Sequence, residues 1–550
     1  MPRLSMTGGQ ALVQALAAHG VEQVFGIPGT HSLEIYRHLD RYGLRHLTPR
    51  HEQGAGYAAD GYARVSGRPG VALTTTGPAL LNIAAAVGQA YSDSVPLLVI
   101  SPGMPLRHPA QSVGSLHEMR SQTDAMRNIA AFSHRVGAVG QIGAAVARAF
   151  ALFAGERPRP VHVEIPLDLL GATEPVGGLP TAPARFPAQA DPTCLSEAAE
   201  TLARAARPAL VLGGGARGAA AKCLALAELL GAPVVTTANG KGIVSEFHPL
   251  SAGVALHSPA VQEWLVDRDV VLAVGTELGE SDYWCEPPRL GGTLIRVDLD
   301  PAQMYNGQPA GIPLVGDAAT VLRALTQLVS VLLPQIQTRA AAIGGDAMAA
   351  AMVTGPAAAA DLRAARNHQT RGRDARWIPY LNAIREVLAP DAVITSDSAM
   401  CCYYGALPHL PIPAEGRYLH PTGFGTLGYA LPAAIGAKAA APDRQVLALS
   451  GDGGLQFTVQ ELATAVQLRQ PLPIVVFDNG GYGEIRNEMA ARGDRPTAVD
   501  LPSPDLPALA RAYGGRGECA ANPAQLAAAL RTALSAPGPT VIVVPEEKAP

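Results

Sequence analysis

The sequence predicts an α/β protein of three domains, each with a parallel sheet flanked by helices. Short runs of apolar and β-branched residues alternate along the whole chain with Ala- and Leu-rich segments of helical length. Strands separated by such segments form parallel sheets with helices on both faces. The 550 residues are too many for one hydrophobic core, and at about 150 residues per domain they correspond to three or four domains.

The apolar runs are the expected strands, and they fall into three groups. The first group is 21–27, 70–76, 96–101 and 160–165. The second group is 209–214, 232–237, 269–275 and 293–299. The third group is 392–397, 445–453, 473–479 and 540–544. The amphipathic segments between successive runs are the expected helices.

Two stretches interrupt this alternation and mark the domain boundaries. Residues 171–192 are rich in Pro, Gly and Ala and are expected to be a linker. Residues 335–375 are Ala-rich, with helical propensity but no clear strand, and are expected to be a connector. The predicted divisions are a first domain at 1–172, a central domain at 190–334, a linker at 335–375 and a last domain at 376–550.

The composition excludes several kinds of partner. With 48% hydrophobic and 16% charged residues, the chain is too apolar to be disordered. Its 42 basic and 46 acidic residues give a net charge of −4, unlike the basic surface of a nucleic-acid or anionic-membrane binder. No run approaches the ~18 to 20 uninterrupted apolar residues of a membrane span. The charge balance therefore favours a small-molecule partner. The six cysteines form no C-x-x-C pair, so we expect a cytoplasmic protein.

A glycine-rich sequence in the central domain is formally a G-x-G-x-x-G motif. GGGARG at 213–218 directly follows a predicted strand, as in dinucleotide-binding folds. The next strand runs into Ala238, Asn239 and Gly240, without the carboxylate that would bind a ribose. We therefore interpret these glycines as a tight strand-to-helix turn.

Polar side chains follow two predicted strands near the C-terminus. One strand ends in Gly-Asp-Gly with Asp452 at its centre, and the next ends in Asp478 and Asn479. Because an amphipathic helix connects the two strands, both ends lie at the carboxyl edge of a parallel sheet, where open α/β sheets bind ligands. Mg²⁺ takes about six oxygen ligands, some of them from phosphate and water. The expected protein ligands are Asp452, Asn479 and the carbonyl of Gly481.

This Gly-Asp-Gly followed by an asparagine-containing turn resembles the signature of thiamine-diphosphate enzymes. Further segments resemble the acetolactate synthase and benzoylformate decarboxylase family, in the same order along nearly the whole chain. These segments are 24–36, 50–64, 77–82, 93–101, 159–168 and 423–436. The resemblance implies a pyrimidine-binding first domain, a central Rossmann-like domain and a diphosphate-binding last domain. The family usually has two asparagines where this chain has Asp478 and Asn479, and the second of these is the expected ligand.

The resemblance implies thiamine diphosphate and Mg²⁺ as cofactors and assigns residues to them. Glu52 would hydrogen bond the pyrimidine ring and activate the cofactor. The carbonyl of Gly425 would accept from the amino group of the cofactor, and Leu427 would support its bent shape, with ordinary core packing as the alternative for Leu427. The other implied cofactor contacts are Pro28, Asn82, Gly453, Gly454, Asn479 and Tyr482.

The same resemblance implies an oligomer. Glu52 and the metal motif belong to different domains, and the family completes each active site between two subunits. A homodimer or a homotetramer is therefore expected. The contacts that residues 396–402 make with the diphosphate are left unassigned, because SDSAMCC departs from the commoner relatives.

Two features separate this chain from acetolactate synthases that contain FAD. Where those enzymes carry an arginine-rich segment, this chain reads GTELGESDYWCEP at 275–287, so FAD is not expected. Where many relatives have a pocket glutamine, this chain has His117, which could transfer a proton or bind a substrate carboxylate. A purely structural histidine is the alternative. Thr30 and His31 are further candidates for substrate contact.

Two glutamates follow the metal turn. In related decarboxylases the residues after the Tyr-Gly pair face the substrate, and here they are Glu484 and Glu488, at i and i+4 on one helical face. Two carboxylates aimed at one site repel unless a cation joins them, and a planar guanidinium with five donors meets that demand. A pairing of Glu488 with Arg486 outside the pocket is the alternative.

We therefore expect thiamine-diphosphate-dependent, non-oxidative decarboxylation of a 2-oxo acid with a cationic side chain, such as 5-guanidino-2-oxopentanoate. An acetolactate synthase-like carboligase is the enzymatic alternative. A non-catalytic scaffold with the same fold is disfavoured, because Glu52, Asp452 and Asn479 are all present.

Overall fold

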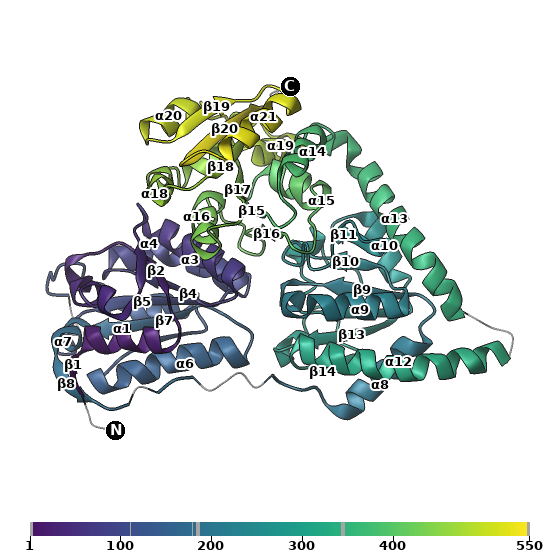
Figure 1. Cartoon of the computed structure of the whole chain (residues 1–550), viewed down its shortest axis with the longest axis horizontal. Helices are drawn as coiled ribbons and strands as arrows, with labels where there is room; N and C mark the ends of the chain where they lie inside the picture. Colours follow the sequence, from purple (N-terminus) through teal and green to yellow (C-terminus); the bar gives the residue numbers. More distant parts are fainter. Residues whose placement is uncertain (1–3, 110–111, 179, 183–186, 343–346, 547–550) are drawn as a thin grey trace. The chain divides into compact units, whose positions relative to one another are not determined.

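The structure is a computed structural model that describes residues 4–109, 112–178, 180–182, 187–342 and 347–546 (Figure 1). Within these ranges the strands form three six-stranded sheets and one two-stranded antiparallel ribbon. The ribbon pairs β1 (Leu4–Thr7) with β8 (Thr173–Val176). Helices flank each of the three sheets, and the predicted α/β class with three domains is confirmed.

The first sheet has the strand order β3-β2-β4-β5-β7-β6, with all neighbours parallel. Its strands are β2 (Gln23–Gly26), β3 (Arg45–Leu47), β4 (Gly70–Leu73), β5 (Leu97–Gly103), β6 (Phe132–Arg135) and β7 (Val161–Pro166). The helices of this domain are α1 (Gly8–Ala18), α2 (Leu33–Tyr36), α3 (Glu52–Ser66), α4 (Pro78–Ser92), α5 (Gln122–Arg127), α6 (Ile142–Gly155) and α7 (Leu167–Gly171).

Successive residues of the inner strands of this sheet enter two different cores. Val24 and Val71 pack with α1 and α6 on one face, whereas Phe25 and Ala72 pack with α3 and α4 on the other. Side chains of a strand alternate between faces, so a strand covered by helices on both faces reads as a continuous apolar run. Because of these continuous apolar runs, the strands can be recognised from the sequence.

The central sheet has the order β11-β10-β9-β12-β13-β14, again with parallel neighbours. Its strands are β9 (Pro208–Leu212), β10 (Val234–Thr236), β11 (Ser251–Val254), β12 (Val270–Val274), β13 (Thr293–Asp298) and β14 (Ile312–Val315). The accompanying helices are α8 (Pro192–Arg204), α9 (Ala220–Leu230), α10 (Pro259–Val266), α11 (Glu280–Tyr283), α12 (Ala318–Ala342) and α13 (Ala347–Asp374).

The third sheet has the order β16-β15-β17-β18-β20-β19. Its strands are β15 (Val393–Ser396), β16 (Arg417–Leu419), β17 (Val446–Gly451), β18 (Leu472–Asp478), β19 (Arg516–Cys519) and β20 (Pro539–Pro545). Helices of this part of the chain are α14 (Ile378–Val387), α15 (Leu407–His409), α16 (Ala430–Ala440), α17 (Asp452–Gln456), α18 (Glu461–Leu468), α19 (Gly483–Ala491), α20 (Leu506–Ala512) and α21 (Pro523–Ala533). Numbered within their own domains, the strands of the first and third sheets have the same order, 2-1-3-4-6-5.

The chain divides into two compact units. One contains the first and third sheets, from residues 1–185, 393–400 and 419–550, and the other contains the central sheet, from 186–392 and 401–418. In the first unit α3 packs directly on α16: a Cβ atom at Gly61 would clash with the carbonyl of Ala433, and one at Gly436 would clash with the carbonyl of Ala58. Glycine on each helix therefore lets the two backbones approach closely.

Both expected linkers contain regular structure. The stretch 171–192 includes strand β8, and its residues 179 and 183–186 lie outside the described ranges. The stretch 335–375 contains the end of α12 and the whole of α13. Its residues 343–346 also lie outside the described ranges. One described helix segment, Ala318–Ile336 of α12, is long and apolar enough to cross a membrane by composition alone. Its Leu322 and Leu325 lie in the core of the central domain, which is the pattern of a helix packed on its own sheet.

Candidate active site

The strand order of the first and third sheets places a ligand site at a defined position. In the order 2-1-3-4-6-5 the chain passes from the first strand to one side of the sheet and from the third strand to the other side. The gap between these two strands is a switch point, and open α/β sheets bind ligands there, outside the carboxyl ends of the strands. In the third sheet this point lies between β15 and β17, which end at Ser396 and Gly451. In the first sheet it lies between β2 and β4.

Asp452 lies at the switch point of the third sheet. It is the first residue of α17 and is 1% exposed. Its Oδ1 accepts the backbone N–H of Asn479 at 3.3 Å, and the Ser503 hydroxyl lies 3.2 Å from its Oδ2 and 2.8 Å from Oδ1 of Asp478. Burial, together with the nearby Asp478 carboxylate, raises the pKa of Asp452. A cation at this position would offset both effects.

Asn479, whose backbone N–H binds the Asp452 carboxylate, carries a second buried oxygen on its side chain. Its Oδ1 is buried and has no hydrogen-bond partner among the described residues. Gly480 and Gly481 follow with φ values of 77° and 138°, a left-handed turn that favours glycine. Within the described ranges no three His, Cys, Asp or Glu side chains gather as metal ligands, so a cation here depends on amide and carbonyl oxygens as well. A carboxylate beside an unpaired amide oxygen fits a hard cation such as Mg²⁺.

The glycines of this motif are closely packed against neighbouring side chains. A Cβ atom at Gly453 would lie 3.2 Å from the ring of Tyr482, and one at Gly454 would lie 3.0 Å from the carboxylate of Asp397. Both glycines are buried. The backbone here therefore approaches its neighbours more closely than a side chain would allow.

Asp397 is a buried carboxylate that the sequence reasoning did not identify. It follows β15 directly and accepts hydrogen bonds from the Ser450 hydroxyl and from the N–H groups of Ser398 and Gly428, each at 2.9 Å. Burial raises its pKa. It lies in the segment 396–402 that was left unassigned, and its position after an inner strand, one strand from Asp452, is the signal that could have found it.

In the first domain Glu52 and Asn82 lie together. Glu52 is the first residue of α3 and is partly exposed, and the Asn82 side-chain amide donates to its Oε2 at 2.9 Å. Pro28 and Thr30 lie in the exposed loop after β2. The two residues expected to contact the cofactor from α3 and α4 are therefore adjacent, and one carboxylate oxygen of Glu52 is oriented by Asn82.

His31 and His117 are linked through a threonine hydroxyl. Nδ1 of His31 lies 2.6 Å from the Thr76 Oγ1, and Nδ1 of His117 lies 3.3 Å from the same oxygen. The ring centroids are 5.5 Å apart, and His117 has a left-handed φ of 60°. Partial burial, with His117 nearby, lowers the pKa of His31. The Thr76 hydroxyl thus links the two rings in one hydrogen-bonded group.

Gly425 and Leu427 lie on a loop that the first domain holds. Asp93 accepts the N–H groups of Thr422 and Gly423 at 3.2 and 3.0 Å. The Gln89 side-chain oxygen accepts from both the N–H and the hydroxyl of Thr426 at 3.3 and 2.9 Å. Gly425 is exposed with a φ of 61°, and Leu427 is partly buried.

Glu484 and Glu488 have different surroundings on α19. Glu484 is partly buried, whereas the Glu488 carboxylate is exposed and lies 3.6 Å from Arg492 one turn later. Arg486, the alternative partner considered for Glu488, instead lies 2.6 Å from the Asp500 carboxylate.

The glycines at 213–215 form a turn at the end of β9. A Cβ atom at Gly214 would lie 3.2 Å from the Asn239 side chain, and one at Gly215 would lie 2.9 Å from Gly275. The Arg217 guanidinium donates to the carbonyls of Asn239 and Lys241, both at 3.0 Å. These close contacts describe a tightly packed turn between β9 and the following helix.

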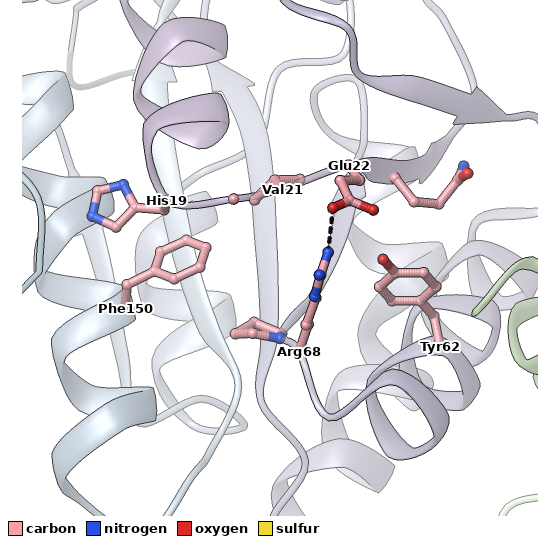
Figure 2. A pocket seen from close by; sticks show the side chains of 9 residues that line it. His19, Val21, Glu22, Tyr62, Arg68 and Phe150 are labelled. Carbon is pink, nitrogen blue, oxygen red and sulfur yellow. Dashed lines mark hydrogen bonds and ion pairs between the residues drawn. The ribbon is translucent and has the colours of Figure 1, made fainter. Parts of the chain in front are cut away.

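A separate pocket of about 330 Å³ lies at the opposite, amino edge of the first sheet, beside the starts of β2 and β4. Figure 2 shows Glu22 and Arg68 facing one another in this pocket. The Arg68 guanidinium donates to the Glu22 carboxylate at 2.5 Å. His19 stacks near Phe150 at the other side of the same pocket. This pocket contains none of the predicted site residues.

Comparison with known families agrees with the three domains. The family described as "Thiamine pyrophosphate enzyme, N-terminal TPP binding domain" matches residues 6–126. The corresponding central domain matches residues 195–325, and the corresponding C-terminal TPP binding domain matches residues 399–544. The resemblance drawn from the sequence is thus confirmed for all three domains.

Three curated relatives are similar over nearly their full length. The chain is 45% identical over 517 residues to the probable 2-ketoarginine decarboxylase AruI of Pseudomonas aeruginosa, covering 93% of this chain and 89% of that protein. It is 30% identical over 574 residues to a probable acetolactate synthase large subunit of Methanocaldococcus jannaschii, covering 99% and 93%. It is also 30% identical over 567 residues to the acetolactate synthase isozyme 3 large subunit of Escherichia coli, covering 96% and 92%.

Proposed function

The chain belongs to the thiamine pyrophosphate enzymes, and from this premise we propose that it decarboxylates a 2-oxo acid with a cationic side chain, 5-guanidino-2-oxopentanoate, without oxidation. The supporting comparison is the 45% identity to a probable 2-ketoarginine decarboxylase, against 30% to the acetolactate synthases. 2-Ketoarginine and 5-guanidino-2-oxopentanoate are the same compound.

The site of the third domain supports the binding of the diphosphate through Mg²⁺. Asp452, the unpartnered Oδ1 of Asn479 and the Gly481 carbonyl are the proposed protein ligands. This unpaired buried oxygen beside a buried carboxylate is the observation that carries the proposal, because such an oxygen is destabilising until it binds a donor or a cation. Gly453, Gly454 and Tyr482 line the same turn.

Thiamine diphosphate, when bound, would supply a nucleophilic carbon and an electron sink for decarboxylation of the 2-oxo acid. Glu52 holds a proton at the pyrimidine ring nitrogen, and Asn82 orients its carboxyl group. The Gly425 carbonyl would accept from the cofactor amino group, and Leu427 and Pro28 would contact the cofactor. His117, joined to His31 through Thr76, moves a proton at the substrate, next to Thr30.

Glu484 and Glu488 are the proposed ligands of the guanidinium. Both lie on α19, which begins two residues after Gly481. Glu484 is the better placed of the two, because Glu488 is exposed and near Arg492. A bidentate contact with a carboxylate is the interaction a guanidinium makes best.

The alternative is an acetolactate synthase-like carboligase. The 30% identity to acetolactate synthases over nearly the whole chain favours this alternative, and the absence of arginines from the segment 275–287 speaks against their FAD site. A non-catalytic scaffold is disfavoured because Glu52, Asp452 and Asn479 are all present.

The test is a panel of 2-oxo acids incubated with the protein, thiamine diphosphate and Mg²⁺. Carbon dioxide release separates either enzyme from a scaffold, and the carbon product separates the enzymes, since a decarboxylase forms an aldehyde and a carboligase a longer hydroxy acid. The proposal expects 4-guanidinobutanal from the guanidino substrate. We further propose that the protein acts as a homodimer or homotetramer in the cytoplasm, and that it binds neither nucleic acid nor membrane.

A further inference from the structure

We propose that Glu461 is a positioning residue for Glu52: its buried carboxylate fixes the entry of α3 and thereby the carboxyl group that activates the cofactor. The inference rests on the role proposed for Glu52. Glu461 begins α18 and lies nine residues after Asp452, so the group that places Glu52 comes from the domain that carries the metal motif.

The contacts of Glu461 reach the two residues directly before Glu52. Its Oε1 accepts the backbone N–H groups of Arg50 and His51, both at 3.0 Å, and its Oε2 lies 3.2 Å from the Arg50 nitrogen. The Thr464 hydroxyl donates to Oε2 at 2.6 Å. A carboxylate held by three donors at both oxygens has one orientation, and the backbone it binds is held with it.

Glu461 has no exposed surface, so these contacts are shielded from water. Burial raises the pKa of Glu461, and the hydrogen bonds from Thr464, Arg50 and His51 oppose that effect. His51 is the N-cap of α3 and Arg50 precedes it, so neither N–H has an acceptor within the helix, and a buried carboxylate from another domain accepts from both. Removing the carboxylate would leave both unpaired.

Gly54 provides an independent observation of the same contact. A Cβ atom there would lie 2.6 Å from the carboxyl carbon of Glu461. Gly54 is inside α3, where alanine is intrinsically favoured over glycine. Helix propensity alone would favour Gly54→Ala, but the added Cβ atom would force the buried Glu461 carboxylate to shift. The positioning role predicts that this shift impairs cofactor activation.

The experiment measures hydrogen–deuterium exchange at the reactive carbon of thiamine diphosphate in the holoenzyme, together with the dissociation constant of the cofactor in Mg²⁺. Glu461→Ala and Gly54→Ala are expected to slow exchange roughly 10- to 100-fold at saturating cofactor, the loss that a misplaced catalytic group causes. Glu461→Gln keeps an acceptor for Arg50 and His51 and should exchange close to the wild-type rate. Gln467→Ala is the matched control, because Gln467 lies on the same helix and its side chain accepts from the Arg50 side chain, at 3.5 Å, and not from the Arg50 or His51 backbone.

Wild-type exchange in both Glu461→Ala and Gly54→Ala would overturn the proposal, as would an equal loss in Glu461→Gln and Glu461→Ala. Should Glu461→Ala not fold, Gly54→Ala and Glu461→Gln still decide the question. Glu52→Gln separates the two levels of inference. If Glu52→Gln exchanges normally, the proposed role of Glu52 is wrong; if it is slow while Glu461→Ala and Gly54→Ala are normal, only the positioning role is wrong.

Discussion

The backbone N–H of Asn479 donates to the carboxylate of Asp452, while the side-chain oxygen of the same asparagine is buried without a partner among the described residues. The hydrogen bond fixes the turn after β18 against the end of β17. The unpaired oxygen is then held beside the carboxylate at a cost of about 1 to 3 kcal/mol, the usual desolvation penalty of such a group. A cation bound by both oxygens would offset this cost.

Asp452→Ala should weaken cofactor retention. The substitution removes the charged ligand of the proposed metal, and we expect the dissociation constant of thiamine diphosphate in Mg²⁺ to rise at least about 10- to 100-fold. Isothermal titration calorimetry and turnover measure the effect. Asp505→Ala, which removes only the N-cap of α20, is the control. Full cofactor occupancy in Asp452→Ala would show that the metal assignment is wrong.

Mixing two inactive variants tests whether active sites lie between subunits. Glu52→Gln alone should reduce turnover by roughly 10²- to 10⁴-fold, the contribution of a positioned acid-base group. In a heterodimer of Glu52→Gln with Asp452→Ala, one shared site carries both changes and the other carries neither. Random reassembly should therefore restore about a quarter of the wild-type activity in a symmetric dimer. No recovery after verified subunit exchange would place each site within one chain.

Glu484 is expected to select a positively charged substrate. Glu484→Gln should raise the KM for 5-guanidino-2-oxopentanoate roughly 10-fold, because a charge-assisted hydrogen bond contributes about 1.5 to 3 kcal/mol, and it should spare an uncharged acid of similar length. Glu488→Gln should act in the same direction but less, because its carboxylate is exposed and near Arg492.

Arg492→Ala is the matched control for this prediction. It frees Glu488 from its neighbour, so the KM for the cationic substrate should not rise. If the wild type prefers pyruvate or an aromatic 2-oxo acid, or if neither glutamate changes the order of substrates, the proposal of a cationic substrate is wrong.

The purified protein should contain no FAD. The segment 275–287 lacks the arginines of flavin-containing relatives, and Arg217 contacts the carbonyls of Asn239 and Lys241 at the carboxyl edge of the central sheet. An absorption spectrum of the native protein near 450 nm tests this, with roughly one flavin per chain as the contrary result. Such a result would support the acetolactate synthase alternative.

His162 should make the fold sensitive to acid. It is buried on β7 between the hydroxyls of Ser101 and Ser133, 2.8 and 2.7 Å away, and burial lowers its pKa from 6.5 to about 3. The unfolded chain therefore binds the proton more readily, and stability is lost as the pH falls below 6.5, by about 1.4 kcal/mol per pH unit until the folded-state pKa is reached.

Urea unfolding between pH 7 and pH 4 measures this slope. His162→Gln should make it shallower, while the exposed His368→Gln should leave it unchanged. An identical slope in His162→Gln and the wild type would mean that other groups dominate the acid sensitivity.

The inner strands of the three sheets are predictable from the sequence, whereas the edge strands are not. In the described part of the chain, every apolar run that was predicted to be a strand forms an inner strand of a sheet. The strands that were missed in the three sheets are the six at their edges: β3, β11, β16, β6, β14 and β19. β3, β6 and β19 have few or no buried residues, so they lack the continuous apolar run that marks a strand covered on both faces. The two-stranded ribbon of β1 and β8 was also missed, because β8 is a strand only through its pairing with β1.

The site was predictable where a motif lies within one stretch of sequence. Asp452 and Asn479 follow inner strands and were proposed in this way; the structure places the Asn479 backbone against the Asp452 carboxylate. Ser503 and Glu461 could not be found, because their roles depend on residues far away in the chain, such as Asp478 and His51. Asp397 could have been found from its position directly after an inner strand, one strand from Asp452. Glu484 and Glu488 share a helical face in the sequence, but spacing alone does not say what lies opposite that face.

The reciprocal contact between α3 and α16 gives the first unit an internal symmetry. Each helix follows the second strand of its own sheet, and the two sheets have the same strand order. Gly61 of one helix meets the carbonyl of Ala433, and Gly436 of the other meets the carbonyl of Ala58. Such an exchange of equivalent contacts is what a two-fold axis produces between identical subunits. The first and third domains thus pack together through equivalent helices, and alanine at Gly61 or at Gly436 should disrupt the same helix contact.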